Sequence, residues 1–328
     1  MRVFARPCRI LSLFSALCVS TALAAASGAQ AQTYPSKTIS LIVGYSPGGQ
    51  ADALARVVAR RLGETLNTPV IVENKPGANG MIAAQLVAQS PADGYAILFV
   101  TDAMATIDPH LPSSGKFDLA ASMEPLISMA AAPLFLAANK DVPASTVREL
   151  VELSKTKDLS FGTSGSTTPH RLAGEMLQKR GNFKMLHVPY KGTSASVNDM
   201  LGGQISLVFG AATALEPLAS AGKIKLIAVT SEKRYPQLPD VPAISETFEG
   251  FNLVSYLGLM VPKGTPADVV ATLNKEVNRV LSNAETRGWM EKQGMIPIGG
   301  SSADFRKQIE ADYKSRGEII REVGMTPD

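Results

Sequence analysis

Cysteine is almost missing from this chain of 328 residues, and both examples, Cys8 and Cys18, lie near its start. The segment around them has a basic beginning, an apolar stretch over residues 10–26, and the small residues Ala29 and Ala31 at a cleavage spacing. The alternative, a membrane anchor helix, needs a longer apolar run. We therefore expect residues 1–31 to be a cleaved signal peptide and the mature chain to start at Gln32. That chain would have no disulfide, thiol nucleophile or cysteine-based metal site.

An excess of one charge is also missing. The sequence has 32 basic and 29 acidic residues, and three of the arginines lie in residues 1–31, which contain no acid. The mature chain therefore has 32 − 3 = 29 basic residues against 29 acidic ones. This balance gives no electrostatic reason to expect binding to nucleic acid or to an anionic membrane.

Histidine is scarce, with only His110, His170 and His187, and no pair has the spacing of metal ligands. We find no H-E-x-x-H, no Walker loop and no G-x-G-x-x-G. Residues 162–166 are one position out of step with the G-x-S-x-G nucleophile motif. The sequence therefore predicts no metal, no cofactor and no catalytic residues. A hydrolase using Ser164 with His170 is the remaining enzymatic alternative.

Short apolar runs that alternate with helical patterns make up most of the chain. We predict strands at 39–43, 70–72, 95–100, 133–138, 159–162, 206–209, 225–229 and 257–261. Helices are predicted at 51–66, 82–88, 146–155, 169–179, 267–281 and 302–323. This alternation predicts an α/β fold with mainly parallel sheets.

A mature chain of 328 − 31 = 297 residues is too long for a typical single core, so we expect two lobes. No linker stands out, and we place the crossings between the lobes near residues 129–138 and 254–260. The first lobe is then 32–132 plus 255–328, and the second is 133–254.

Two loops that join a strand to a helix are candidates for ligand binding. The first contains Tyr45, Ser46, Gly48, Gly49 and Asp52. Two glycines let a ligand approach the backbone, and the free amides at a helix start attract a carboxylate or phosphate. Asp52 could orient this loop or accept a hydrogen bond from a ligand. An ordinary strand-to-helix turn is the alternative.

The second loop is rich in hydroxyl groups and precedes Pro169, which suits the first position of a helix. Its candidate ligand-binding residues are Thr163, Ser164, Ser166, Thr167 and His170. Four hydroxyls exceed what capping one helix requires. The two loops fall in different predicted lobes, and together they would suit a small molecule with carboxylate or other polar groups at its ends.

A third candidate segment follows the strand that ends at Val100. In open α/β sheets, ligands bind beyond the carboxyl ends of the strands. Thr101 and Asp102 are therefore candidate ligand-binding residues. A surface loop without such a role is the alternative.

Several short motifs, in this order, are typical of one family. They are Ser46-Pro47-Gly48-Gly49, residues 72–78 (VENKPGA), 91–95 (PADGY), 187–192 (HVPYKG), 239–242 (PDVP) and 262–266 (PKGTP). With them, essentially the whole mature chain resembles the Bug family, the TctC-like extracytoplasmic solute receptors of tripartite tricarboxylate transporters.

The resemblance implies a type II periplasmic-binding fold with two lobes around a central ligand cleft. It implies a monomeric periplasmic protein that takes a small organic acid, or a related polar ligand, to membrane permease subunits. It also assigns ligand contacts to the Gly-Gly loop and to the hydroxyl-rich loop. A sensor that docks on a membrane signalling partner is an alternative that the sequence leaves open.

The sequence departs from the family at one position. Many members have Phe-Asp after a strand of the second lobe, whereas this chain has Phe209-Gly210. The missing carboxylate argues against an amino acid as the ligand, because an ammonium group would have no partner there.

Overall fold

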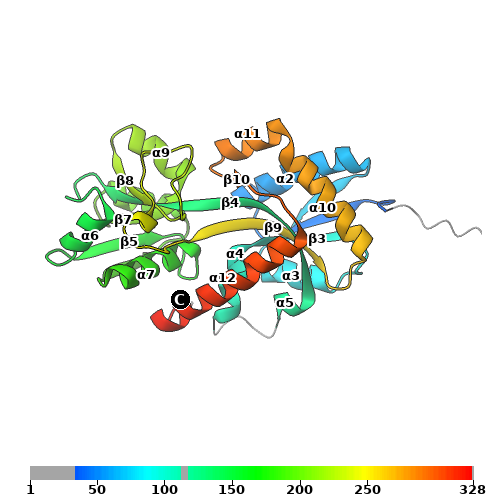
Figure 1. Ribbon diagram of the computed structural model, residues 1–328, viewed down its shortest axis with the longest axis horizontal. Helices are drawn as coiled ribbons and strands as arrows, with labels where there is room; N and C mark the ends of the chain where they lie inside the picture. The colour runs from blue at the N-terminus through cyan, green and yellow to red at the C-terminus, as the bar shows by residue number, and fades with distance from the viewer. Residues whose placement is uncertain (1–33, 112–116, 327–328) are drawn as a thin grey trace, which may run out of the picture. The chain divides into compact units, whose positions relative to one another are not determined.

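The computed structural model describes residues 34–111 and 117–326, and its strands form two sheets that share one long strand (Figure 1). Sheet A contains β1 (Ile39–Val43), β2 (Val70–Asn74), β3 (Ala96–Thr101), β9 (Val254–Pro262) and β10 (Ile296–Pro297). Sheet B contains β5 (Leu159–Thr163), β6 (Met185–Pro189), β7 (Leu207–Ala211) and β8 (Ile224–Val229). The long strand β4 (Met123–Asn139) pairs in both sheets. All of these strands belong to one unit, Lys37–Asp328.

Each sheet combines a parallel set of strands with antiparallel neighbours. Strand β1 lies parallel to β2 and β3, and β5 lies parallel to β6 and β7. Strand β4 pairs antiparallel with β7, β8, β9 and β10. The main path of strands is therefore β2-β1-β3-β9-β4-β7-β5-β6.

Helices cover the faces of both sheets. With sheet A lie α2 (Gln50–Leu66), η2 (Ala78–Gly80), α3 (Met81–Ala88), α4 (Asp102–Thr106), η3 (Asp108–His110), α5 (Leu119–Ser122), α10 (Ala267–Ser282), α11 (Ala284–Lys292) and α12 (Ser302–Val323). With sheet B lie α6 (Val147–Leu153), α7 (Pro169–Gly181), α8 (Thr193–Leu201), α9 (Ala212–Ser220) and η4 (Ile244–Glu246). Helix α2 illustrates why these segments are helical, because its buried residues Leu54, Val58 and Leu62 recur at intervals of four.

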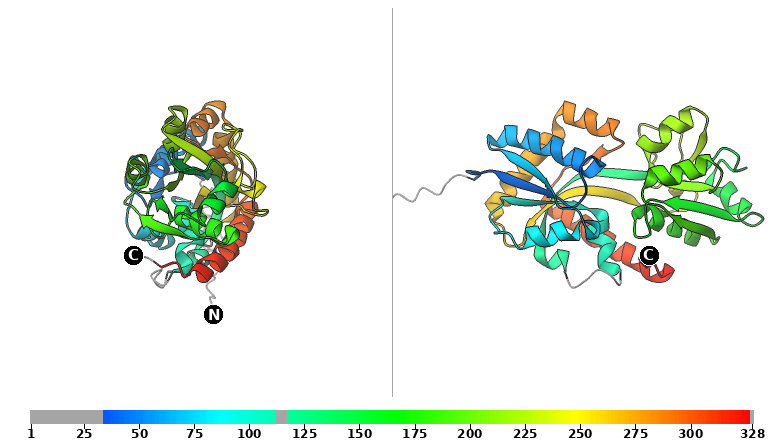
Figure 2. Two further views of the ribbon diagram at one scale, coloured as in Figure 1. Left: turned by 90° about the vertical axis from the view of Figure 1, so that its left-hand side faces the viewer. Right: turned by 180° about the vertical axis from the view of Figure 1, so that it is seen from behind.

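The strand β4 is buried on both faces. Its even positions Leu134 and Leu136 pack in one cluster with α7, and Phe135 and Ala137 pack in another with α8 and α9. This alternation follows from the two-residue period of a strand. Figure 1 shows β4 and β9 running between the elements of sheet A and those of sheet B, and Figure 2 shows the same crossing from behind.

The register shows where the carboxyl ends of the parallel strands point. Thr101, the last residue of β3, lies opposite Leu257 of β9, which in turn lies opposite Ala130 of β4. Ala211, the last residue of β7, lies opposite Leu134 of β4. The two parallel sets thus point toward each other, and they are separated by four residues of β4, which is about 13 Å of extended chain.

The predicted α/β fold with two lobes is confirmed, and we call the elements around sheet A the first lobe and those around sheet B the second lobe. The antiparallel partners of β4 make both sheets mixed, which periodicity along the chain does not reveal. The exact domain boundaries stay a prediction. The predicted signal peptide, residues 1–31, lies outside the described residues.

Candidate functional site

The first candidate loop connects β1 to α2 and presents backbone groups. Gly48 has a φ of +88°, a conformation that glycine adopts without strain. Gly49 is the N-cap of α2 and provides no side-chain hydrogen bond to the helix start. Residues 46–50 are exposed. The first amides of α2 can therefore donate hydrogen bonds to an acceptor from outside, as an anion site requires.

Asp52 is buried and stabilises this loop from inside. Its carboxylate accepts hydrogen bonds from the Gly48 amide (3.0 Å), Arg56 Nε (3.0 Å) and Asn74 Nδ2 (2.9 Å). The hydrogen bond from Arg56 lowers the pKa of Asp52 to about 2, against the opposing effect of burial. Asn74 Nδ2 also donates to the Tyr45 carbonyl (3.0 Å). The internal donors favour the orienting role over the ligand contact, which stays a prediction.

Tyr45 joins the first loop to the end of β3. Its hydroxyl lies 2.8 Å from Thr101 Oγ1, and it donates to the Asn79 carbonyl (3.2 Å). Burial raises the pKa of Tyr45, so its hydroxyl stays protonated at neutral pH. Thr101 also caps α4 by accepting from the Met104 amide (3.4 Å). The structure thus brings these two predicted site residues together.

Asp102 has a different environment from its neighbour Thr101. It is buried, and its Oδ2 atom accepts a hydrogen bond from Arg316 Nη1 of α12 at 2.5 Å. Arg316 also donates to Thr106 Oγ1 (3.0 Å) and to the Val254 carbonyl (2.9 Å). This ion pair connects α4 to α12 and to the start of β9, and a ligand contact by Asp102 stays a prediction.

Sequence reasoning missed the loop between β2 and α3. Four consecutive residues of this loop, Gly77, Ala78, Asn79 and Gly80, have positive φ angles, a strained arrangement for Ala78. Asn79 donates from Nδ2 to Asp108 Oδ2 (2.7 Å), and this loop follows a third parallel strand of sheet A. The Asn-Gly pair is a turn signal that could have pointed to it.

Burial raises the pKa of the Asp108 carboxyl to about 6. The hydrogen bond from Asn79 opposes that increase, and the charge of Asp102 adds to it. The group is 8% exposed.

The second candidate loop follows β5 and begins α7. Thr163 is fully buried, and its Oγ1 atom donates to the Gly165 carbonyl (2.9 Å) and lies 2.7 Å from His187 Nε2. Thr168, which we did not predict as a site residue, is the N-cap and accepts from the Arg171 amide (3.5 Å). Capping therefore uses one hydroxyl of the loop, and Thr163 supports the loop internally.

The remaining hydroxyls of this loop differ in their partners. Ser164 Oγ lies 3.0 Å from His170 Nδ1. Thr167 is half-buried. Ser166 is 6% exposed, and its Oγ atom has no hydrogen-bond partner among residues 34–111 and 117–326. A buried hydroxyl without a partner costs about 1–3 kcal/mol, so an external group that bonded to Ser166 would remove this cost.

The Ser164–His170 pair also bears on the hydrolase alternative. Burial lowers the pKa of His170 to about 4, so its imidazole is neutral at pH 7 but is a weak base. A general base works best with a pKa near the working pH. The geometry allows a hydrogen bond, and the pKa makes proton abstraction from Ser164 unfavourable.

The end of β7 shows what replaces the family's carboxylate. A Cβ atom at Gly210 would lie 3.2 Å from both Thr193 Cγ2 and Leu215 Cδ1. Helix α9 then begins with Ala211 as its N-cap, without a side-chain hydrogen bond. This edge of the second lobe therefore presents backbone and a small hydrophobic surface.

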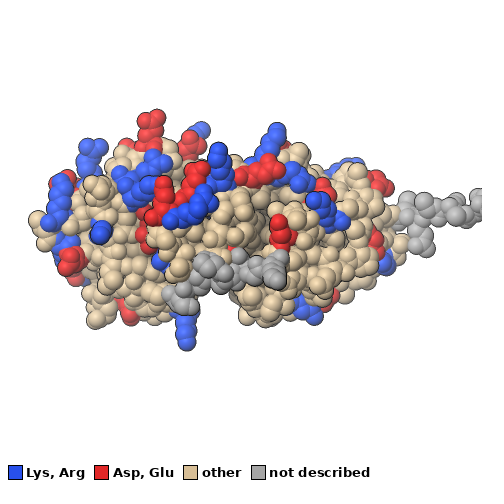
Figure 3. Space-filling view, turned by 90° about the horizontal axis from the view of Figure 1, so that it is seen from below, with Lys and Arg blue, Asp and Glu red and all other residues tan. Residues whose placement is uncertain are grey.

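Residues 34–111 and 117–326 have the features of neither a membrane-spanning helix nor a metal centre. No helix there is long and apolar enough to cross a membrane. No group of three or more His, Cys, Asp or Glu side chains there could hold a metal ion. On the face seen in Figure 3, basic and acidic side chains are interspersed.

Comparisons with known proteins identify the family. A family model described as the tripartite tricarboxylate transporter family receptor matches residues 54–325. A UPF0065 protein of Bordetella bronchiseptica is 33% identical over 283 residues, which are 86% of this chain and 83% of that protein. A solved structure from R. palustris with adipate is 30% identical, with a TM-score of 0.78, over 90% of this chain and all (100%) of that one. The periplasmic binding protein BugD is 30% identical, with a TM-score of 0.73 and the same coverage of 90% and 100%.

These matches confirm the resemblance that the short motifs indicate. The family model extends from the second turn of α2 to the residue after the C-cap of α12, so it includes the second candidate loop and begins just after the first. This chain belongs to the receptor family of tripartite tricarboxylate transporters.

Proposed function

We propose that this protein is a periplasmic receptor that closes around a small organic carboxylate and delivers it to the permease subunits of a tripartite tricarboxylate-type transporter. The observation that carries the proposal is the register of β4, by which the parallel strands of both lobes end facing each other. Ligands of α/β sheets bind beyond such strand ends.

The two loops can bind an anion through amide and hydroxyl groups, without a basic side chain that pairs with it. The first loop offers exposed backbone amides at the start of α2, and the second offers the buried hydroxyl of Ser166. A hydrogen bond to a charged group contributes roughly 1.5–3 kcal/mol, and micromolar affinity needs about 8 kcal/mol. Four to six such bonds, less the entropy lost on binding, would suffice.

The relatives support a carboxylate as the ligand class. The R. palustris structure, at 30% identity, is described with adipate. Gly210 removes the acidic side chain that would pair with an ammonium group, so we favour acids without an amino group. Calorimetry and thermal unfolding with adipate and other mono-, di- and tricarboxylates would test this. At about 100 times the Kd, a ligand should stabilise the protein by about 2.7 kcal/mol.

Ser166→Ala separates ligand binding from folding. The variant removes a buried hydroxyl that lacks an internal partner, so the unliganded protein should unfold at the same temperature or slightly higher. Loss of one hydrogen bond to a carboxylate should raise the Kd by roughly tenfold or more. Ser282→Ala, on α10 and bonded to the Asn278 carbonyl, is the matched control. An unchanged Kd in Ser166→Ala would remove Ser166 from the site, and no stabilisation by any acid would remove the proposed function.

The transporter partnership needs a separate measurement in cells. Deletion of the gene should abolish uptake of the identified acid while transcription in response to that acid is unchanged. Unchanged uptake together with a lost transcriptional response would favour the sensor. The hydrolase alternative predicts turnover that Ser164→Ala abolishes. We expect no turnover in the wild type.

A further inference from the structure

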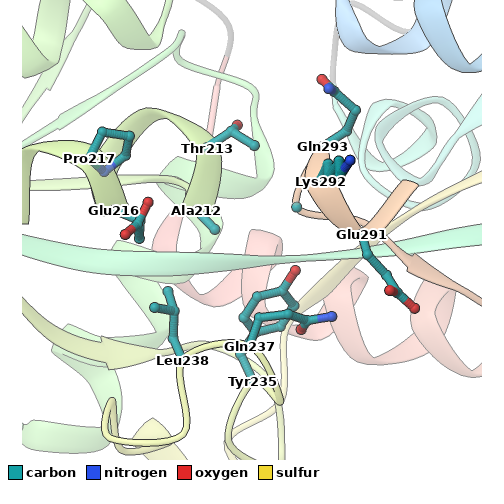
Figure 4. A pocket seen from close by; sticks show the side chains of 11 residues that line it. Ala212, Thr213, Glu216, Pro217, Tyr235, Gln237, Leu238, Glu291, Lys292 and Gln293 are labelled. Carbon is teal, nitrogen blue, oxygen red and sulfur yellow. The ribbon is translucent and has the colours of Figure 1, made fainter. Parts of the chain in front are cut away.

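A pocket of about 420 Å³ lies between α9 of the second lobe and the end of α11 of the first lobe (Figure 4). One wall consists of the first two turns of α9 and residues 235–238 after β8, all from the second lobe. The other wall consists of residues 291–294 at the end of α11, from the first lobe. No residue of 44–49 or 163–170 lines this pocket. A molecule bound here would contact both lobes.

Tyr235 gives the pocket an unused polar group. The residue is 2% exposed, and its ring packs edge-on against Phe135 of β4 at 5.5 Å between centroids. Its hydroxyl has no hydrogen-bond partner among the described residues. In Figure 4 the Tyr235 side chain lies between those of Glu216 and Glu291. The cost of leaving a buried hydroxyl unbonded favours an occupant that bonds to it.

The charges around this hydroxyl are mainly negative. Glu216 of α9 and Glu291 of α11 place one carboxylate on each wall, and Lys292 is the single basic residue that lines the pocket. Burial and, to a smaller extent, the charge of Glu291 raise the pKa of Tyr235, which keeps the phenol neutral. A cation between the two walls would be attracted by both carboxylates.

A metal ion does not suit this arrangement. Metal sites gather at least three strong ligands, and no such group occurs in residues 34–111 and 117–326. The pocket also has apolar surface from Ala212, Pro217 and Leu238, which would contact the carbon atoms of an organic ion. An ammonium group has three donors and no acceptor, which matches two carboxylates and the oxygen of a phenol.

We propose that this pocket binds a small organic ammonium ion, a monoamine or short diamine, between Glu216 and Glu291, with the Tyr235 hydroxyl accepting a hydrogen bond. The residues that line this pocket differ from those proposed to bind the carboxylate. Glu216 Oε1 accepts a hydrogen bond from Ser220 (2.8 Å), so the ion would bind through the other carboxylate oxygen.

Calorimetry on the full mature protein, without any organic acid, tests the site. Methylammonium and putrescine are titrated as chlorides against sodium chloride at equal ionic strength. We expect saturable binding of at least one amine and none of sodium. Glu216→Gln and Tyr235→Phe should each weaken that binding by about tenfold or more. Glu318→Gln, an exposed position on α12 outside the pocket, should leave it unchanged.

Several results would overturn the proposal. They are the absence of saturable amine binding, an equal loss of binding in Glu318→Gln, and unchanged binding in both pocket variants. Binding of acetate that depends on Lys292 in place of amine binding would show an anion site. Tyr235→Phe keeps the ring on Phe135, so an unchanged unfolding temperature without amine will show that it is folded. Because no acid is present, failure here leaves the carboxylate receptor standing.

Discussion

Replacing Arg316 with Met should destabilise the protein more than any surface change on the same helix. The side chains of Arg316 and Asp102 are 5% and 4% exposed, and their atoms are 2.5 Å apart. Met fills much of the same volume but leaves the carboxylate of Asp102 buried without its cation. Breaking one side of a buried ion pair costs about 3–5 kcal/mol. The same variant also removes the donors to Thr106 and Val254.

Urea unfolding, followed by circular dichroism, would measure this loss of free energy. Arg306→Met is the matched control, because Arg306 lies on the same helix and pairs with Glu124 at the surface, with side chains 45% and 35% exposed. Exposed pairs contribute roughly 0–1 kcal/mol, so the control should lose little. In the double variant Arg316→Met with Asp102→Leu, much of the stability should return, because no buried charge remains.

Two results would refute this reasoning. If Arg316→Met and Arg306→Met lose the same free energy, the pair does not behave as a buried one. If Asp102→Leu fails to recover stability in the Arg316→Met background, the loss comes from something other than an unpaired charge. Asp102→Asn should also change ligand affinity less than it changes stability, if Asp102 supports the fold and does not touch the ligand.

Three further predictions concern pH, the first loop and the second loop. The native pKa of Asp108, about 6, exceeds its ordinary value of 3.8, so the native state binds this proton more tightly than the unfolded state. Stability therefore falls as pH rises from about 4 to about 6, and Asp108→Asn should remove up to about 3 kcal/mol of that change in urea unfolding. Gly48→Ala should lower stability by about 1 kcal/mol, because φ is +88° there, whereas Gly49→Ala at a φ of −80° should be nearly neutral by thermal unfolding. Arg171→Met should raise the Kd for the acid, because Arg171 Nη1 donates to the Ser166 carbonyl (3.0 Å) and to the Thr326 carbonyl (3.1 Å).

Each of these has an outcome that would contradict it. For Asp108, the free energies of unfolding of the wild type and of Asp108→Asn would change in parallel between pH 4 and pH 6. For the glycines, the two alanine variants would unfold alike. For Arg171, the prediction would be wrong if Arg171→Met had the wild-type Kd and the wild-type rate of hydrogen exchange at the chain end. Thr326→Ala is the control, because it keeps the carbonyl group and should therefore behave like the wild type.

The sequence was sufficient for the fold class and for most elements, because apolar periodicity reflects burial directly. The final helix, predicted at 302–323, is Ser302–Val323 in the structure. Strand β4 was predicted only over its second half, because its first half contains Pro125 and packs against β9, a partner more than a hundred residues away. Local patterns also missed α4, α8, α9 and α11, which are short and interrupted by polar residues.

The candidate site was predictable in its loops but not in the partners of its acids. The pairing of Asp52 with Arg56 follows the i, i+4 spacing of a helix and could have been read from the sequence. The pairing of Asp102 with Arg316 spans 214 residues and depends on how α12 packs. The buried state of Asp108 depends on the β2–α3 loop, whose unusual backbone has no clear sequence signature beyond Asn79-Gly80.

Asp52, Asp102 and Asp108 lie near the ends of β1, β2 and β3, where uncompensated carboxylates would repel a carboxylate ligand. Asp52 is compensated by Arg56, and Asp102 by Arg316. Asp108 accepts a hydrogen bond from the neutral amide of Asn79, and its raised pKa of about 6 means that it becomes neutral in mildly acidic solution. The negative field at the first loop should therefore weaken below pH 6, while an acid with a lower pKa stays ionised. Affinity for such a ligand should increase as pH falls through 6 in the wild type and should stay constant in Asp108→Asn, because there the field no longer depends on a proton.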